Sequence, residues 1–249
     1  ETMGKLAHMA VSYYDDLPEE LLTPQTRIYR GMALIREAGA LLSRGDYQTA
    51  NPKLDEAWTI FDKLRAGGDK GEAVAVGLAL SKFVRFSSWG VSGGPGSRPT
   101  DLQETADLLR PWVQAKGTSP QTKMLYADVL NYLSHTLPEG QDIATCEEAR
   151  KILLDVGARD LSDLRAASIY ADTADSQARH SLNAGKVKEA EQLENEVYAM
   201  AEKVLAQRPG DLRSMANRAL AADFLGRLAI RRHDYVAATD HAARSALAG

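Results

Sequence analysis

The sequence holds a single cysteine, and this shortage limits how the chain can be stabilised. Cys146 is the only cysteine among 249 residues, so an internal disulfide is excluded. A chain of this length buries enough surface to fold without disulfides or a structural metal. One unpaired thiol is compatible with a reducing compartment, although many exported proteins also lack disulfides. We favour a cytoplasmic location on this ground and leave the compartment open.

The chain also lacks a strong charge of one sign and a long apolar run. Its 34 acidic and 30 basic residues give a formal net charge of −4, without the basic field that attracts nucleic acid. No apolar run approaches the roughly 20 residues of a membrane-spanning helix, and no signal-peptide pattern opens the chain. We therefore expect neither a nucleic-acid partner nor a membrane span. Because apolar periodicity begins almost at Glu1, we expect a fragment of a longer protein.

Aromatic residues make up only 6% of the chain, and period-two runs of β-branched residues are missing. Alanine and leucine are abundant, and apolar residues recur at three-and-four spacing, which is typical of helices. The sequence predicts an all-α domain over residues 1–249 with about eleven helices. Most connections are short, so neighbouring helices are expected to be antiparallel. The one long connection is a Gly/Pro/Ser-rich loop at 87–100.

The sequence contains signals for the starts of several helices. Thr23-Pro24 and Ser119-Pro120 each place a capping hydroxyl before a proline at the first helical position. Thr100 and Gln103 have the spacing of a capping box. These signals predict where three of the helices begin.

Three similar turns separate helices that pair. Gly45 and Gly185 are each expected to take the left-handed conformation that ends a helix. Asp46 is expected to accept hydrogen bonds from the first N–H groups of the next helix. The third turn, at His233-Asp234, has a histidine in the position of the glycine. The sequence thus predicts recurring helical hairpins, stacked as a solenoid that buries the apolar faces of successive pairs.

These turns resemble those of tetratricopeptide repeats, whose unit places a small residue late in its first helix, then Gly-Asp-Tyr, then an alanine three residues further on. The hairpin at Gly45 matches this pattern at Leu34, Ala38, Leu41, Tyr47, Ala50, Leu54 and Ala57. The hairpin at Gly185 matches at Ala174, Ala178, Val187 and Ala190, and the hairpin at His233 matches at Ala222, Leu225, Gly226, Tyr235 and Ala238. The recognisable turns are not spaced by the family's 34 residues, which marks the repeats as degenerate.

The resemblance implies a right-handed α-α superhelix whose first helices line a concave groove. The positions that match the family's contact residues are Met32, Ile35, Gly39, Leu42, Asp172, Asp175, Arg179, Asp223 and Arg227. The Lys and Asn residues of a carboxylate clamp are absent there, which argues against capture of acidic C-terminal peptides. More loosely, the stretch from Thr23 to Leu64 is similar to tracts in bacterial multidomain signalling proteins that carry a TIR domain, kinase, cyclase or winged-helix regulator.

Aromatic residues mark a second possible contact. Trp58 and Phe61 belong to the expected inner stripe of the helix after Gly45. Phe83, Phe86 and Trp89 follow one another at three-residue spacing into the long loop, and we expect core packing for this stripe. The alternative is that Trp89, at the end of its helix, is exposed and anchors a partner.

Reactive side chains do not converge in the sequence. The glycine-rich stretch 90–96 lacks the Gly-Lys-Ser/Thr of a phosphate-binding loop, the five histidines are scattered, and no histidine is placed to activate Cys146. The carboxylates at Asp15-Asp16 and Glu19-Glu20 are expected to face water. We therefore expect no enzyme activity, catalytic set, metal or cofactor.

The leading hypothesis is a non-catalytic scaffold that binds a protein or peptide, including another domain of the same protein. A self-association module, giving a homo-oligomer, is the first alternative, because the first helix has no upstream mate in the sequence. The second alternative is a ligand-sensing regulatory domain.

Overall fold

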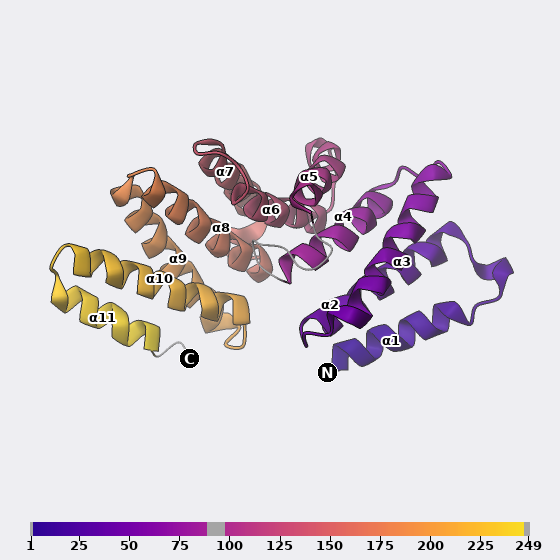
Figure 1. The fold of residues 1–249 in the computed structure, drawn as a ribbon, viewed down its shortest axis with the longest axis horizontal. Helices are drawn as coiled ribbons and strands as arrows, with labels where there is room; N and C mark the ends of the chain where they lie inside the picture. Colours follow the sequence, from indigo (N-terminus) through magenta and orange to yellow (C-terminus); the bar gives the residue numbers. More distant parts are fainter. Residues whose placement is uncertain (1, 89–97, 247–249) are drawn as a thin grey trace. The chain divides into compact units, whose positions relative to one another are not determined.

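The computed structural model describes residues 2–88 and 98–246, and this part of the chain consists of helices joined by turns and short connections (Figure 1). It contains eleven α-helices and no strand, which confirms the all-α prediction and its helix count. From α1 to α5 and again from α6 to α11, helices that follow one another in the chain pack against each other, which is consistent with a helical solenoid. The chain divides into two compact units, residues 1–118 and 119–249, and each is described here by itself. The single domain over 1–249 stays a prediction.

Each unit has its own set of helices. Unit 1 contains α1 (Thr2–Asp15), a short 3-10 turn (Glu19–Leu21), α2 (Pro24–Leu42), α3 (Tyr47–Ala66), α4 (Glu72–Ser87) and α5 (Pro99–Gln114). Unit 2 contains α6 (Pro120–Ser134), α7 (Gln141–Leu153) with a π turn at Leu154–Ala158, α8 (Leu164–Asn183), α9 (Val187–Gln207), α10 (Leu212–Arg231) and α11 (Tyr235–Ala246).

The predicted starts of α2 and α6 are confirmed. The Thr23 hydroxyl accepts a hydrogen bond from the Thr26 N–H at 3.2 Å, and Ser119 accepts one from Thr122 at 3.1 Å. The predicted capping box at Thr100 is wrong, because α5 begins earlier, at Pro99. There the Arg98 N–H donates to the Asp101 carboxylate at 2.7 Å. Proline at the first helical position therefore marks all three starts.

The hairpin turns have the predicted backbone conformation. Gly45 and Gly185 have φ angles of +79° and +78°. His233 adopts φ +60°, so the histidine occupies the left-handed region that favours glycine. Asp46 and Asp234 then cap the next helices by accepting hydrogen bonds from the N–H groups three residues on, at 3.1 and 3.0 Å.

The core of unit 1 is built around one aromatic ring. Phe61 of α3 is fully buried, and its ring lies between Gly31 of α2 and Gly77 of α4. A Cβ atom added to Gly31 would lie 2.6 Å from the ring, and one added to Gly77 would also overlap it. The prediction that Trp58 belongs to this inner stripe is wrong, since its side chain is 37% exposed.

The core of unit 2 depends on alanine. Ala174 and Ala178 of α8 and Ala190 of α9 are fully buried where the two helices pack together. Small side chains allow a close approach of the helix backbones, because no bulky group separates them.

The expected Phe83 and Phe86 packing in unit 1 is confirmed, as both side chains are buried.

A regular packing relation connects the helices of each unit. The first helix of a pair packs against its own second helix and against the first helix of the next pair. This relation holds for α2 with α3 and α4, for α6 with α7 and α8, and for α8 with α9 and α10. The two helices on which the first helix packs are also in contact with each other, namely α3 with α4, α7 with α8 and α9 with α10. Each of these first helices therefore lies in a groove between two others.

The left-handed His233 generates a test of the turn. We expect His233→Gly to raise the free energy of unfolding by about 0.5 kcal/mol, because it removes a strained backbone conformation and loses only one exposed side-chain contact. Gly185→Ala is the matched control. No atom lies within 4 Å of its added Cβ, so only the backbone changes, and we expect a loss of about 1 kcal/mol. Urea denaturation measures both. A destabilised His233→Gly variant would contradict this explanation.

Candidate functional site

The predicted groove positions of unit 1 lie mainly in its interior. Ile35 and Leu42 are buried members of the core cluster, and the half-buried Met32 packs against that cluster. Their side chains stabilise α2 against its neighbours and do not form an exposed apolar surface. Trp89, the predicted anchor, lies outside the described residues.

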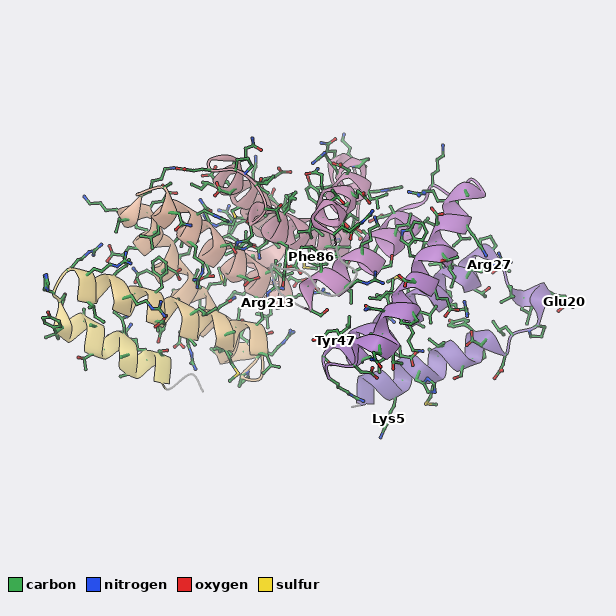
Figure 2. The ribbon with its side chains drawn as sticks, viewed as in Figure 1. Lys5, Glu20, Arg27, Tyr47, Phe86 and Arg213 are labelled. Atoms are coloured by element: carbon green, nitrogen blue, oxygen red, sulfur yellow. The ribbon has the colours of Figure 1, made fainter. Side chains whose placement is uncertain are left out.

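In unit 2 the structure joins Asp172 to residues of two other first helices. Arg213 of α10 donates to the Asp128 carboxylate of α6 at 2.7 Å and also to the Asp172 carboxylate of α8. Asn131 of α6 donates its amide hydrogen to Asp172 at 2.9 Å. We name these four residues, Asp128, Asn131, Asp172 and Arg213, the polar ladder. Arg213 is labelled in Figure 2.

The Arg213 guanidinium of the polar ladder is held in its charged form. Burial alone would lower the pKa of the Arg213 guanidinium, but Asp128 and Asp172 outweigh it and hold that pKa above its ordinary value. Burial, followed by the same two carboxylates, raises the pKa of Tyr132 to about 12. The site thus keeps two carboxylates and one guanidinium together between α6, α8 and α10. Charges in such a place are stable only while they remain paired.

A second charged group continues along α8 and α10. Arg179 donates two hydrogen bonds to the Asp175 carboxylate, at 2.9 and 3.0 Å, and its side chain stays 44% exposed. Arg227 lies 2.9 Å from Asp223 one turn earlier on α10 and is 75% exposed. Hydrogen bonding to Asp175 raises the pKa of Arg179, and the charge of Asp223 contributes. The two helices that carry these pairs, α8 and α10, pack against each other. We name these four residues, Asp175, Arg179, Asp223 and Arg227, the charged row.

Glu194 of α9 is buried beneath the charged row. Its side chain is fully buried, and neither of its carboxyl oxygens has a hydrogen-bond donor among the described residues. Burial, followed by the negative charge of Asp175, raises the pKa of Glu194 to about 9, whereas Arg179 lowers it. The carboxyl group is therefore protonated at neutral pH.

Sequence reasoning missed Glu194 and three of the four residues of the polar ladder. The hydrogen bonds of the polar ladder join distant parts of the chain. Asp172 bonds to Asn131 and Arg213, and Arg213 in turn bonds to Asp128. A sign was available for Glu194, which stands beside Leu193 and Val197 on the apolar stripe of its helix. A carboxylate on such a stripe indicates either a buried acid or a break in the pattern.

Two of the scattered histidines are brought together. The rings of His135 and His180 lie 5.0 Å apart, with His180 against the Asp142 carboxylate at 3.0 Å. Burial lowers the pKa of both rings, and the charge of Asp142 works against this at His180. Burial also raises the pKa of the Cys146 thiol to about 11. Within residues 2–88 and 98–246, no group of three or more His, Cys, Asp or Glu side chains is arranged to hold a metal ion.

The chemistry available to the charged row is ion pairing and hydrogen bonding. A guanidinium has five donors, and an aspartate occupies only some of them. The Arg227–Asp223 pair is exposed, and such pairs are worth only about 0–1 kcal/mol, so a carboxylate from another molecule can join or replace Asp223 at little cost. Asp175 is buried, so at Arg179 an incoming carboxylate joins the internal one without replacing it. Throughout the described part of the chain, no helix combines the length and apolar character that a membrane span requires.

Glu194 generates a test of the site's electrostatics. Its raised pKa means that the folded state binds more protons than the unfolded state between pH 4.5 and about 9. Stability therefore falls as pH rises through this window. We expect Glu194→Gln to remove this dependence and to stabilise the chain at pH 7 by up to about 3 kcal/mol, with little effect at pH 4. Denaturation at several pH values measures it.

Glu194→Ala serves as the control for that test, because it removes the acid and also leaves a cavity. It is expected to flatten the pH dependence as Glu194→Gln does, and to be less stable than Glu194→Gln at every pH. If Glu194→Gln instead destabilised the chain at pH 7 and above, Glu194 would be ionised and paired with Arg179 in the folded state.

Comparison with known proteins leaves this geometry to be interpreted on its own. No protein-family model matches the chain, and no curated protein matches its sequence.

Proposed function

We propose that this chain is a non-catalytic scaffold for protein–protein interaction, and that unit 2 binds a partner through the charged row. The observation that carries the proposal is the arrangement of Arg179 and Arg227. Each is partly exposed, each is held by an aspartate one turn earlier, and they belong to the packed first helices α8 and α10. Such a surface suits a partner segment that presents carboxylates next to basic side chains.

The helices beneath the charged row favour a rigid binding surface. The polar ladder ties α6, α8 and α10 together, and buried alanines keep α8 close to α9. Side chains on rigid helices lose little conformational freedom when they bind, which leaves more of the interaction energy for affinity. Charge complementarity at the rim of such a surface contributes mainly to specificity and to the rate of association.

The resemblance to tetratricopeptide repeats supports the same function. It suggests that the chain is the interaction or regulatory region of a bacterial multidomain signalling protein. The surface proposed here differs in one respect from the groove that the resemblance implies. Its charged part lies in unit 2, whereas Ile35 and Leu42 of unit 1 are core residues.

Photo-crosslinking in cells tests the proposal. A benzoylphenylalanine at position 227 should give a discrete crosslinked partner, whereas the same group at the exposed Lys203 of α9 should not. Arg179→Glu with Arg227→Glu should lower the yield of this adduct at least tenfold when read from a crosslinker at position 223. The double variant Lys188→Glu with Lys203→Glu is the control. It makes the same change in net charge on the exposed side of α9 and should leave the yield unchanged.

Two results would contradict the proposed function. One is the absence of any protein adduct at positions 223 and 227. The other is an equal yield from positions 203 and 227, because it would indicate collision without a binding surface.

A further inference from the structure

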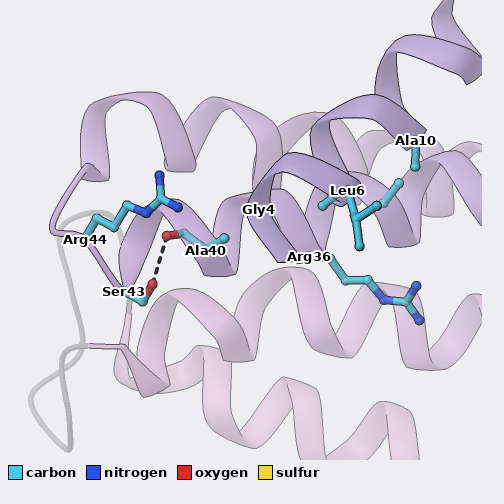
Figure 3. A pocket seen from close by; sticks show the side chains of 9 residues that line it. Gly4, Leu6, Ala10, Arg36, Ala40, Ser43 and Arg44 are labelled. Carbon is cyan, nitrogen blue, oxygen red and sulfur yellow. Dashed lines mark hydrogen bonds between the residues drawn. The ribbon is translucent and has the colours of Figure 1, made fainter. Parts of the chain in front are cut away.

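A groove with a volume of about 560 Å³ runs between α1 and α2 in unit 1 (Figure 3). All nine residues that line it come from these two helices and from the turn that follows α2. The floor is built from small apolar side chains, among them Ala10, Ala33 and Ala40. The Ser43 hydroxyl donates to the Ala40 carbonyl at 2.8 Å, so it is turned back onto its own helix. The groove thus combines a small-residue floor with few competing polar groups.

The packing relation among the helices indicates which kind of element fits this groove. In three places a first helix lies between its own second helix and the first helix of the next pair, namely α2, α6 and α8. The helices α1 and α2 pack against each other as α3 and α4 do. They therefore form the kind of groove that a helix fills elsewhere in the chain, and its floor of small residues leaves room for the side chains of a helix.

Exposed apolar side chains extend the same surface along both helices. Leu6, Ala10 and Tyr13 lie at i, i+4 and i+7 on α1, and all three are at least partly exposed. Tyr29 and Ala33 lie one turn apart on α2, and Tyr29 is exposed. An incoming helix would cover these side chains, so its own facing stripe must be apolar.

Two arginines determine which charge the incoming helix should carry. Arg36 and Arg44 line the groove, and both are exposed. Among the described residues, neither side chain makes a hydrogen bond or an ion pair, unlike Arg30 of the same helix, which pairs with Asp15 at 2.7 Å. Arg36 lies on α2, and Arg44 lies eight residues later in the turn that continues it, where the Arg44 N–H donates to the Leu41 carbonyl at 3.0 Å. The two residues are therefore about 12 Å apart along the helix axis. Figure 3 shows Arg36 below Leu6 and Arg44 at the left of the view.

We propose that this groove binds an amphipathic helix with an apolar stripe of small and medium side chains and two carboxylates about two turns apart, which pair with Arg36 and Arg44. The proposal goes beyond the scaffold function, because it assigns a second surface and a defined partner chemistry. It does not depend on the charged row of unit 2, so the two can fail independently.

Synthetic helical peptides test the proposal with the full chain. Two peptides of equal length share one Leu/Ala stripe and differ only at two flanking positions, seven or eight residues apart, that carry Glu in one and Lys in the other. Fluorescence anisotropy should show the Glu peptide binding at least tenfold more tightly than the Lys peptide. Arg36→Glu with Arg44→Glu should reverse this order. The preference should also shrink as salt is added, because the pairs lie near solvent.

Two matched controls isolate the groove. Lys70→Glu with Lys116→Glu makes the same change in net charge within unit 1 at exposed residues that do not line the groove, and should preserve the preference for the Glu peptide. Arg179→Glu with Arg227→Glu should preserve it as well, even though it is designed to abolish binding by unit 2. Thermal unfolding of the Arg36→Glu with Arg44→Glu variant should match that of the original chain, because neither arginine makes a hydrogen bond or an ion pair among the described residues.

Three outcomes would overturn the proposal. One is equal affinity for the two peptides, and another is a preference that Arg36→Glu with Arg44→Glu does not reverse. The third is a dimer, seen by light scattering, that Leu6→Glu dissolves and that excludes the Glu peptide, because a second copy of the chain would then be the occupant.

Discussion

Helices in both units depend on close approach at positions that carry little or no side chain. In unit 1, α2 and α4 present Gly31 and Gly77 to the two sides of the Phe61 ring. In unit 2, α8 and α9 meet at Ala178 and Ala190, which are fully buried. An extra methyl group at such a contact has nowhere to go, because the surrounding interior is already close-packed. This steric constraint determines the spacing of the helices and thus the shape of every surface between them.

The two units use the constraint in different ways. In unit 1 the Phe61 ring fills the contact between α2, α3 and α4. In unit 2 buried alanines fill the contact between α8 and α9, and the polar ladder connects the first helices α6, α8 and α10. Charges in that position are costly unless each has a partner, so Arg213 and the two aspartates stabilise the arrangement only as a set. The partly exposed charges of the charged row and the groove between α1 and α2 are the surfaces left after the internal contacts are made. Both proposals concern these surfaces.

Much of the fold could be predicted from the sequence because its signals are local. Thr23-Pro24, Ser119-Pro120 and the Gly45 and Gly185 turns act within a few residues of themselves, and the structure confirms each. The start of α5 was misjudged because Thr100 and Gln103 offered a plausible local alternative to Pro99 and Asp101. Trp58 was misjudged because helical spacing predicts a face and not how far that face is covered.

The site could be predicted only in part. Asp172, Asp175 and Arg179 were identified through a repeat pattern, but their partners Asn131, Arg213 and Glu194 come from other helices. Nothing in their local sequence indicates which residues they meet, since this depends on how the helices stack. The same pattern assigned Ile35 and Leu42 to a groove, whereas the structure buries both side chains in the core of unit 1. A repeat pattern assigns a position on a helix without specifying whether the next helix covers it.

One comparison within α2 tests the central claim most directly. Gly31→Ala would place a methyl group against Phe61, whereas Gly39→Ala meets only Val84 at 3.9 Å. Alanine is the better helix former by about 1 kcal/mol, so Gly39→Ala should stabilise the chain by roughly that amount. Gly31→Ala should instead destabilise it by about 1–3 kcal/mol, and Phe61→Leu should remove most of that penalty in a double-mutant cycle. Equal stabilisation by both alanines, or strict additivity with Phe61→Leu, would contradict the account.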